Sequence, residues 1–336
     1  MSWPLIDILK LHHPEDTEKS SVRAFGGLEL NKEFNELCSD FVEKQQISYK
    51  RLAKDFFNVN HNSVQSWRGF NKKYPNGHPI PLWALGKILE LLNLRYEEKH
   101  REIIEKIHYL QCGRVSEKIK AVKHLTPDLI KLCGAHAADG SLYGAKKRGV
   151  LSAVWDIGDQ EKENIVETGK WIEKIFGFKP VLKKKGNMAY MRSNKQVLSR
   201  YLTQIFDFPI GRKTEIVKMP KILYGNDERI LDSDGNALLK LQLGFAKEVI
   251  NFDGHSTLSG RVVQVGLGSN SKELLKNVSS IFDHFGVKFN HYENKILTTS
   301  YKEGRKLYSL GIFRGQKRKK FVNLILQHTP KAEKHP

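Results

Sequence analysis

Two segments of the chain lie about 114 residues apart, and each reads as an apolar helix that ends in Asp-Gly. They are LCGAHAADG, residues 132–140, and AKEVINFDG, residues 246–254. Thr126 and Pro127 predict the start of the first helix, because these residues are favoured at a helix cap and at the first helical position. A duplicated helix with an acid at its end constrains the fold strongly, since both copies need equivalent surroundings.

The elements predicted after each of these helices come in the same order. Two strands, a helix, a hairpin turning at Gly186 and Asn187, and a closing helix follow the first segment. The same series follows the second segment, with residues 288–313 as its hairpin. We therefore expect an α+β fold with two pseudo-symmetric αββαββα repeats, residues 125–235 and 236–336.

The N-terminal third has a different pattern. Residues 1–32 read as an irregular arm, residues 33–96 as an all-α domain, and residues 97–124 as a helical and basic linker. Within the all-α domain, LAKDFFNVNHNSVQSWRG resembles the phage-repressor type of helix-turn-helix. Apolar residues such as Leu52 and Trp67 fit the buried positions of that arrangement.

The resemblance to a helix-turn-helix implies that its second helix reads DNA bases. The residues that would contact DNA are His61, Asn62, Gln65, Ser66 and Arg68. A small helical bundle that only packs against the rest of the chain is the alternative.

The charge of the chain favours a polyanionic partner. Lys and Arg total 56 against 37 acidic residues, which gives a net charge of +19. Residues 125–336 hold 36 of the basic and 21 of the acidic residues, so most of the excess lies in the two repeats. A surplus of this size is typical of proteins that bind nucleic acid, with a generally basic soluble protein as the alternative.

The sequence shows neither a membrane span nor a secretory signal. No run of about 18 uncharged apolar residues occurs, and the N-terminus lacks an apolar core followed by a cleavage site. The three cysteines have no metal-ligand spacing. We expect a cytoplasmic, nucleoid-associated protein without membrane contacts. Its two ends lack splicing residues, so we also expect it to be free-standing.

The first Asp-Gly segment resembles the LAGLIDADG motif at Leu132, Gly134, Ala138, Asp139 and Gly140. The second segment keeps Ile250, Asp253 and Gly254. Together with the repeat order, these residues make the region from 125 to 336 resemble the monomeric, two-repeat LAGLIDADG homing endonucleases. The resemblance implies a monomer with internal pseudo-two-fold symmetry that cuts double-stranded DNA at specific sites.

Small residues four apart on one helix face let a second helix approach closely. Gly134 and Ala138 provide such a face in the first helix, and Gly244 and Glu248 would meet it from the second. Glu248 and Phe252 are bulky for a close helix contact, and Glu248 would also bring an unpaired charge into it.

Two such helices side by side bring Asp139 and Asp253 together at their ends. Two close carboxylates repel each other unless a cation lies between them, and oxygen ligands favour Mg²⁺ or another hard divalent cation such as Mn²⁺. Asp139 and Asp253 are therefore the expected metal ligands and catalytic residues. With a bound metal they would serve the hydrolysis of a phosphodiester.

The resemblance also implies a basic residue near each acid. Lys213, 74 residues after Asp139, and Lys331, 78 residues after Asp253, are the expected catalytic lysines. Arg212, Lys317 and Lys334 are alternatives. The strand residues expected to contact DNA are Lys146, Lys147, Arg148, Lys183, Lys185, Arg192, Arg261, Gln264, His291, Lys302, Arg305 and Lys306.

Two other functions fit the same observations. One is a transcriptional regulator that grips DNA with a catalytically weakened LAGLIDADG scaffold, and the other is an RNA-splicing maturase. The altered second motif favours the regulator, whereas the retention of both acids favours the endonuclease.

Overall fold

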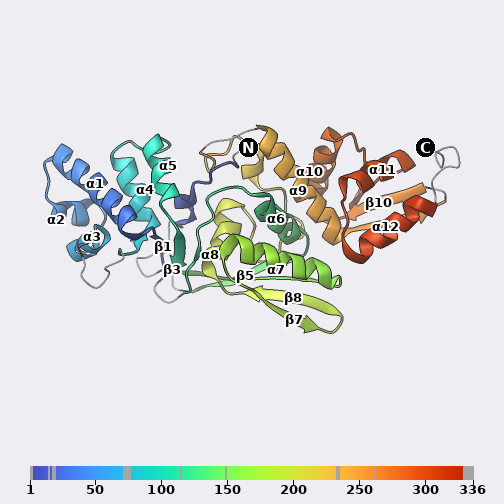
Figure 1. Ribbon diagram of the computed structural model, residues 1–336, viewed down its shortest axis with the longest axis horizontal. Helices are drawn as coiled ribbons and strands as arrows, with labels where there is room; N and C mark the ends of the chain where they lie inside the picture. Colours follow the sequence, from blue (N-terminus) through green and yellow to red (C-terminus); the bar gives the residue numbers. More distant parts are fainter. Residues whose placement is uncertain are drawn as a thin grey trace.

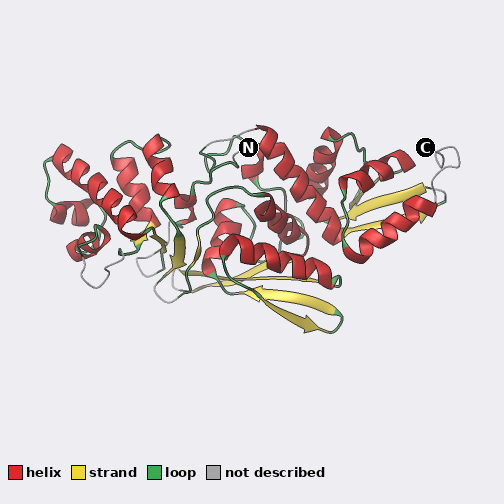
Figure 2. Cartoon of the chain, in the orientation of Figure 1, coloured by secondary structure: helices red, strands yellow, loops and turns green. Residues whose placement is uncertain are grey.

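The computed structural model describes residues 3–13, 16, 20–70, 77–113, 116–147, 150–231, 235–260 and 262–327. The molecule is elongated, with the N-terminal part, the first repeat and the second repeat following one another along its long axis (Figure 1). Within the described residues each part contains a four-stranded antiparallel sheet (Figure 2). No helix in this part of the chain is both long enough and apolar enough to cross a membrane.

The first repeat opens with helix α6, Pro127–Asp139, whose first turn is capped by the Thr126 side chain. Its remaining elements are β5 (Gly140–Lys147), β6 (Val150–Asp159), α7 (Lys162–Phe176), β7 (Val181–Lys185), β8 (Met188–Ser193), α8 (Gln196–Arg200) and η3 (Tyr201–Ile205). The strand order is β5-β6-β8-β7. Buried residues alternate with half-buried ones along β6, so one face of the sheet packs against the helices and the other stays open.

The second repeat has the same sheet topology. Helix α9, Gly235–Asp253, is followed by β9 (Gly254–Ser259), β10 (Val262–Gly268), α10 (Lys272–His284), β11 (Asn290–Tyr292) and β12 (Lys295–Leu297). The order β9-β10-β12-β11 matches that of the first sheet. The expected α+β class with two αββαββα repeats is thereby confirmed.

The second repeat differs from the expectation in one element. Residues 288–313 do not form one long hairpin, because the chain turns into helix α11, Tyr301–Leu310, before α12, Gly315–Gln327. The Ser300 side chain caps α11 by accepting a hydrogen bond from the Glu303 N–H at 3.2 Å. Gly304 and Leu307, three residues apart, are its buried positions. The cap and this spacing are helical features that the sequence analysis read as strand.

Residues 33–96, expected to be all-α, contain one two-residue strand in the part that the structure describes, and three further strands lie in the segments expected to be the arm and the linker. The strands are β1 (Val22–Phe25), β2 (Ile80–Pro81), β3 (Tyr109–Cys112) and β4 (Ile119–Lys120), in the order β2-β1-β3-β4. These strands have two to four residues and come from distant parts of the region. Periodicity over so few residues is too weak a signal to reveal a strand.

The helices of this region are η1 (Ile8–Leu11), α1 (Gly27–Gln45), α2 (Tyr49–Arg51), η2 (Leu52–Phe56), α3 (His61–Trp67), α4 (Leu82–Leu91) and α5 (Glu98–Glu105). Helix α1 thus begins inside the segment expected to be an arm. The residues expected to be buried around the turn before α3, including Leu52, Val64 and Trp67, are buried.

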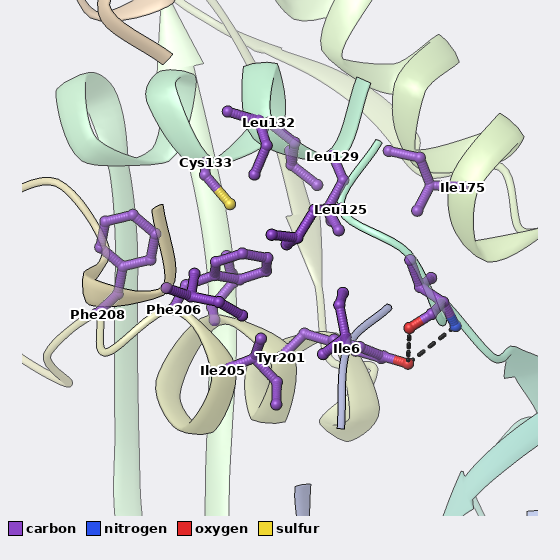
Figure 3. Packing of buried hydrophobic residues seen from close by; sticks show 14 of the residues in the cluster. Ile6, Leu125, Leu129, Leu132, Cys133, Ile175, Tyr201, Ile205, Phe206 and Phe208 are labelled. Atoms are coloured by element: carbon purple, nitrogen blue, oxygen red, sulfur yellow. Dashed lines mark hydrogen bonds between the residues drawn. The ribbon is translucent and has the colours of Figure 1, made fainter. Parts of the chain in front are cut away.

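Residues 4–9, expected to belong to an irregular arm, are buried in the core. Ile6 is fully buried near Leu125 and Tyr201, as Figure 3 shows. The Tyr201 hydroxyl donates to the Val122 carbonyl at 3.0 Å and accepts from the Val122 N–H at 2.9 Å. Burial of Ile6 in this cluster attaches the start of the chain to the first repeat.

Asp7 links the same segment to the N-terminal helices. It is fully buried, and it bonds His100 at 3.1 Å and Arg95 at 2.9 Å. Because the Tyr96 N–H donates to His100 Nδ1, the proton of a neutral His100 lies on Nε2 and is donated to Asp7. These bonds join residue 7 to the end of the N-terminal region.

Candidate active site

Helices α6 and α9 pack closely against each other at Gly134. A Cβ atom at Gly134 would lie 2.6 Å from the Phe245 carbonyl oxygen and 2.8 Å from the Glu248 Cβ. Such distances leave no room for a side chain, so the glycine permits the close approach. Ala138 is partly buried in the core. Gly244 has no atom within 4 Å of its Cβ position, so the expectation that it forms part of the contact is wrong.

Each of the two helices ends in its acid, and a glycine turns the chain at once into a strand. A Cβ atom at Gly140 would lie 2.1 Å from His136 Nδ1, and one at Gly254 would lie 2.3 Å from the Ile250 carbonyl oxygen. The glycine in each Asp-Gly pair is therefore required by the turn back over the last helical residues. This explains why the pair occurs at both positions.

Asp139 and Asp253 meet where the two helices end. The carboxyl groups of the two residues are close enough for the charge of Asp253 to act on Asp139. Asp139 is half-buried. Asp253 is exposed by its accessible area, although the protein atoms around its carboxyl group still remove part of its hydration. The predicted convergence of two acids that are far apart in the sequence is thus present in the structure.

The surroundings disfavour two negative charges at this point. The pKa of Asp139 rises to about 7, first because of burial and then because of the charges of Asp253 and Asp159. Burial also raises the pKa of Asp253, although the charges of Lys213 and Lys317 lower it. The nearby lysines therefore do not fully compensate the negative charges of the two carboxylates. A bound cation would stabilise these charges.

Lys213 lies at the end of α6, as expected. Its Nζ donates hydrogen bonds to the carbonyl oxygens of His136, Ala137 (2.8 Å) and Ala138 (2.7 Å). Burial lowers the pKa of Lys213 to about 8, although Asp253 and Asp139 raise it. A cation at the C-terminal end of a helix is favourable because the last carbonyl groups carry partial negative charge.

Lys317 occupies the equivalent place in the second repeat. Its Nζ donates to the carbonyl oxygens of Asn251 (2.9 Å) and Phe252, at the end of α9. Lys331, the lysine expected at this place, lies outside the described residues, and Lys317 is one of the alternatives to it. Fewer residues separate the lysine from its acid in the second repeat than in the first. Lys317 is part of helix α12, which reaches the end of α9, whereas Lys213 lies in the chain after η3.

Glu248 has a partner, contrary to the expectation of an unpaired charge. Arg314 donates to its two carboxylate oxygens at 3.0 and 2.6 Å, and the guanidinium lies 4.9 Å from the centre of the Trp171 ring. Trp171 belongs to α7, so this ion pair lies where the two repeats meet. The sequence analysis could not find Arg314, because the residue comes from the short connection between α11 and α12.

A chain of buried amides connects the same two repeats beside the acids. Asn164 donates to Asp159 at 2.6 Å and accepts from Asn251 at 2.8 Å, and Asn251 accepts from the Arg314 N–H at 2.9 Å. Asn251 stands two residues before Asp253 in α9. These bonds fix the end of α9 against the first repeat.

Residues 250–326, which run from α9 to α12, match the family of LAGLIDADG-like domains. The resemblance inferred from the second Asp-Gly segment is confirmed by this match.

Solved structures similar to the chain include I-DmoI in complex with DNA and Mn, at 16% identity and a TM-score of 0.38, covering 62% of this chain and 100% of that one. The LAGLIDADG meganuclease I-AabMI bound to uncleaved DNA is 14% identical, covering 59% and 89%, with a TM-score of 0.37. The homing endonuclease I-WcaI bound to its DNA recognition sequence is 10% identical, covering 59% and 87%, with a TM-score of 0.40.

Part of the chain is also similar to the probable translation initiation factor IF-2 of Methanocaldococcus jannaschii, at 28% identity over 159 residues. The match covers 43% of this chain and 12% of that protein, so this chain spans a small part of its relative's length.

The open face of the sheet in the second repeat presents fewer of the expected DNA-contacting residues than that in the first repeat. Gln264 of β10 lies opposite Thr257, on the face away from buried Val263 and Val265. His291 bonds Ser279 of α10 at 2.9 Å, so its ring is on the helix-covered side. Three other expected strand residues, Lys302, Arg305 and Lys306, belong to α11. Arg261 lies outside the described residues.

In the first repeat, three of the expected contacts lie on the open face of the sheet. Arg192 alternates along β8 with buried Met191 and Ser193, and the pairing of β7 with β8 puts Lys183 and Lys185 on the same face as Arg192. All three side chains are exposed. The backbone of Lys146 and Lys147 belongs to β5, but their side chains and all of Arg148 lie outside the part of the chain that is described.

The candidate DNA contacts of the N-terminal region bond one another along α3. Gln65 Nε2 lies 3.0 Å from His61 Nε2, and the Arg68 Nη1 donates to Gln65 Oε1 at 3.4 Å. The Arg68 guanidinium also lies 3.4 Å from the centre of the Tyr49 ring, so its position is fixed by protein contacts. Asn62 is exposed and Ser66 is half-buried.

Proposed function

We propose that this chain is a site-specific endonuclease that cuts both strands of duplex DNA where α6 and α9 end, with the help of a divalent cation. The observation that carries the proposal is the meeting of Asp139 and Asp253 at two adjoining helix ends. A lysine stands at each end, Lys213 at the first and Lys317 at the second. A pair of acids flanked by two cations is a suitable setting for phosphodiester hydrolysis.

The two acids fit a hard divalent cation. They offer only oxygen ligands, and burial together with mutual repulsion makes their second negative charge unfavourable. The described residues hold no cluster of three or more His, Cys, Asp or Glu that could bind a metal. Mg²⁺ is often held by one or two carboxylates together with water and substrate phosphates. Asp139 and Asp253 would hold the cation, which when bound supplies Lewis-acid stabilisation of the phosphate.

Lys213 acts through its charge and its position. An ammonium group has three N–H donors, and those of Lys213 are directed at three backbone carbonyl oxygens. While these bonds persist, Lys213 therefore has no free N–H group to donate to the reacting water. Its charge helps to keep both acids ionised and favours the negative charge that develops on the phosphate. Lys317 has the corresponding role beside Asp253.

The partner is a polyanion that fits the charge of the two repeats. Residues 125–336 contain 36 Lys and Arg against 21 Asp and Glu. Lys183, Lys185 and Arg192 are exposed on one face of the first sheet. The two lysines, which have no ion pair with the described acids, are suited to bind phosphates and release the counterions of DNA.

Incubation with a randomised duplex library and Mg²⁺ tests the proposal. The wild type should cut specific sequences, and Asp139→Asn and Asp253→Asn should each lose cutting while still binding the selected duplex. Unchanged cutting in either variant would contradict the assignment of the acids. Specific binding by the wild type without any cutting would favour the DNA-binding regulator instead.

A further inference from the structure

We infer that Arg192 reads a guanine in the DNA target, and that Asp156 and Tyr143 hold its guanidinium in position for this contact. The inference rests on the proposed function, because it assigns part of the sequence preference of the same enzyme. It concerns a cluster on the open face of the first sheet that takes no part in the arrangement of the two acids.

The three side chains come from three neighbouring strands. Asp156 of β6 lies directly opposite Arg192 of β8, and Tyr143 of β5 stands one strand further along. Arg192 Nη2 donates to Asp156 Oδ2 at 3.2 Å, and the Tyr143 hydroxyl donates to the same oxygen. The guanidinium lies 5.5 Å from the centre of the Tyr143 ring. The carboxylate and the ring thus restrict the arginine from two sides.

The exposure of the pair shows which member reaches a ligand. The Asp156 side chain is 22% exposed and the Arg192 side chain is 53% exposed. Asp156 therefore forms the floor and Arg192 the tip of the cluster. A guanidinium carries five N–H donors, and the described residues provide one hydrogen-bond acceptor for it, on Asp156. Donors remain for a partner above the sheet.

The carboxylate argues against a phosphate contact at this point. Asp156 places a negative charge beside the guanidinium, and a phosphate drawn to Arg192 would be repelled by it. Lys183 and Lys185 on the same face have no ion pair with the described acids, and they are better suited to phosphates. A base edge in the major groove carries no net charge, so the acid does not repel it.

Guanine is the base whose edge fits the arginine. It presents two acceptors in the major groove, O6 and N7, and a guanidinium can donate to both at once. Adenine and cytosine present a donor at one of the corresponding places, and that donor would face the guanidinium without an acceptor. Fixing the guanidinium in advance lowers the entropy lost in forming the paired hydrogen bonds.

Selection of bound duplexes from a randomised pool, without divalent metal, followed by sequencing, tests the inference. The variants are Arg192→Ala, Arg192→Lys and Asp156→Asn, and Lys185→Ala is the matched control on the same face. We expect a guanine at one position in the wild-type sites. Arg192→Ala should lose preference at that position by about tenfold to a hundredfold. Arg192→Lys should lose part of it, because an ammonium group lacks the planar fork of a guanidinium. Both variants should keep the preferences elsewhere.

Asp156→Asn separates positioning from charge. It should weaken the guanine preference while duplexes of all sequences bind as tightly as before or more tightly, since a negative charge is gone. Lys185→Ala should weaken all sequences alike and keep the guanine preference.

Two results would overturn the inference while the proposed function stands. One is that Arg192→Ala loses affinity equally for every sequence. The other is that Arg192→Ala keeps the guanine preference although the wild type selects and cuts a specific site. A wild type that selects no sequence at all would refute both the inference and the proposed function. Arg192→Lys keeps the charge at an exposed position, so its result does not depend on a change in folding.

Discussion

Asp139 holds a carboxyl group whose charge is disfavoured by burial, by Asp253 and by Asp159. An acid whose pKa is higher in the folded than in the unfolded protein binds protons more tightly when folded. Folding stability therefore falls as pH rises from the unfolded value near 4 to the folded value of about 7. This loss of folding stability arises because the site buries Asp139 and holds two acids close together without a bound cation.

Asp139→Asn should therefore be more stable than the wild type above pH 7. We expect an increase of about 1–3 kcal/mol in the free energy of unfolding at pH 8, which shrinks to nothing near pH 4. Thermal melting of both proteins from pH 4 to pH 8, without divalent metal, checks this. Glu293→Gln, in an exposed hairpin turn, is the control. Equal melting temperatures at pH 8 would show that the Asp139 charge is not disfavoured.

Lys213→Met should slow cutting and move its pH dependence to higher pH. Without the ammonium, the pKa values of Asp139 and Asp253 rise further, because Lys213 lowers both. Cutting should fall about a hundredfold to a thousandfold at neutral pH, by analogy with the loss of one stabilising donor. Single-turnover cutting measured from pH 6 to pH 9 checks both effects.

Arg212→Met is the matched control, since it removes the same charge at the exposed neighbouring position. It should leave the pH profile unchanged. A larger effect at Arg212 than at Lys213 would assign the catalytic cation to Arg212.

At the scale of elements, the contact of α6 with α9 sets the distance between the acids. Gly134→Ala adds a Cβ that would lie 2.6 Å from a backbone oxygen of α9, so the helices must separate. We expect a loss of about 1–3 kcal/mol in stability, as for other overpacked contacts, together with a loss of cutting. Denaturant unfolding and a cutting assay measure the two effects.

Gly244→Ala provides the control on α9 itself. Nothing lies within 4 Å of its Cβ position, so the substitution should be neutral, or stabilising by up to about 1 kcal/mol through helix propensity. If both glycine variants behaved alike, the close approach at Gly134 would not be what holds the two helices in place.

The ion pair between Glu248 and Arg314 makes a further test of the same contact. Arg314→Met leaves a buried carboxylate without its partner and should cost about 3–5 kcal/mol. Adding Glu248→Gln removes the stranded charge and should restore much of the loss, which denaturant unfolding of the two variants would show. No recovery in the double variant would mean that Arg314 acts by packing on Trp171 and not by pairing.

Local features of the sequence predicted the first helix and both acids. Thr126, Pro127 and the glycine after each acid are signals within a few residues of the chain, and the structure places each where its local chemistry requires. Lys317 and Arg314 could not be ranked first, because they lie on α12 and just before it, and this helix follows α11 with no counterpart after α8 and η3 among the described residues of the first repeat. His291 was read as an outward residue, but its neighbours across β12 and α10 decide its face.

At the scale of the whole molecule, the N-terminal region and the repeats are joined through residues that the sequence analysis set aside. Ile6 and Asp7 are fully buried, which composition alone could not indicate. The two αββαββα repeats followed from order and periodicity, whereas the small sheet of residues 22–120 brings together strands too short to be seen in sequence.

Binding of DNA by the whole protein should depend steeply on salt, because the chain has a net charge of +19. Each phosphate contact contributes about −0.9 to the slope of log association constant against log salt. The double variant Lys183→Gln, Lys185→Gln should make this slope about two contacts shallower. Lys170→Gln, on α7 at the other face of the same repeat, should not change it. An unchanged slope in the double variant would mean that DNA does not lie on the open face.

The most direct test of the central claim is a titration of Mn²⁺ into the protein at pH 8, followed by the electron paramagnetic resonance of free Mn²⁺. Asp139 and Asp253 should form one shared binding site in the wild type. That site should be lost to the same extent in Asp139→Asn, in Asp253→Asn and in the double variant, because each acid needs the other. Retention of the site in either single variant would show that the two carboxyl groups do not hold a common cation.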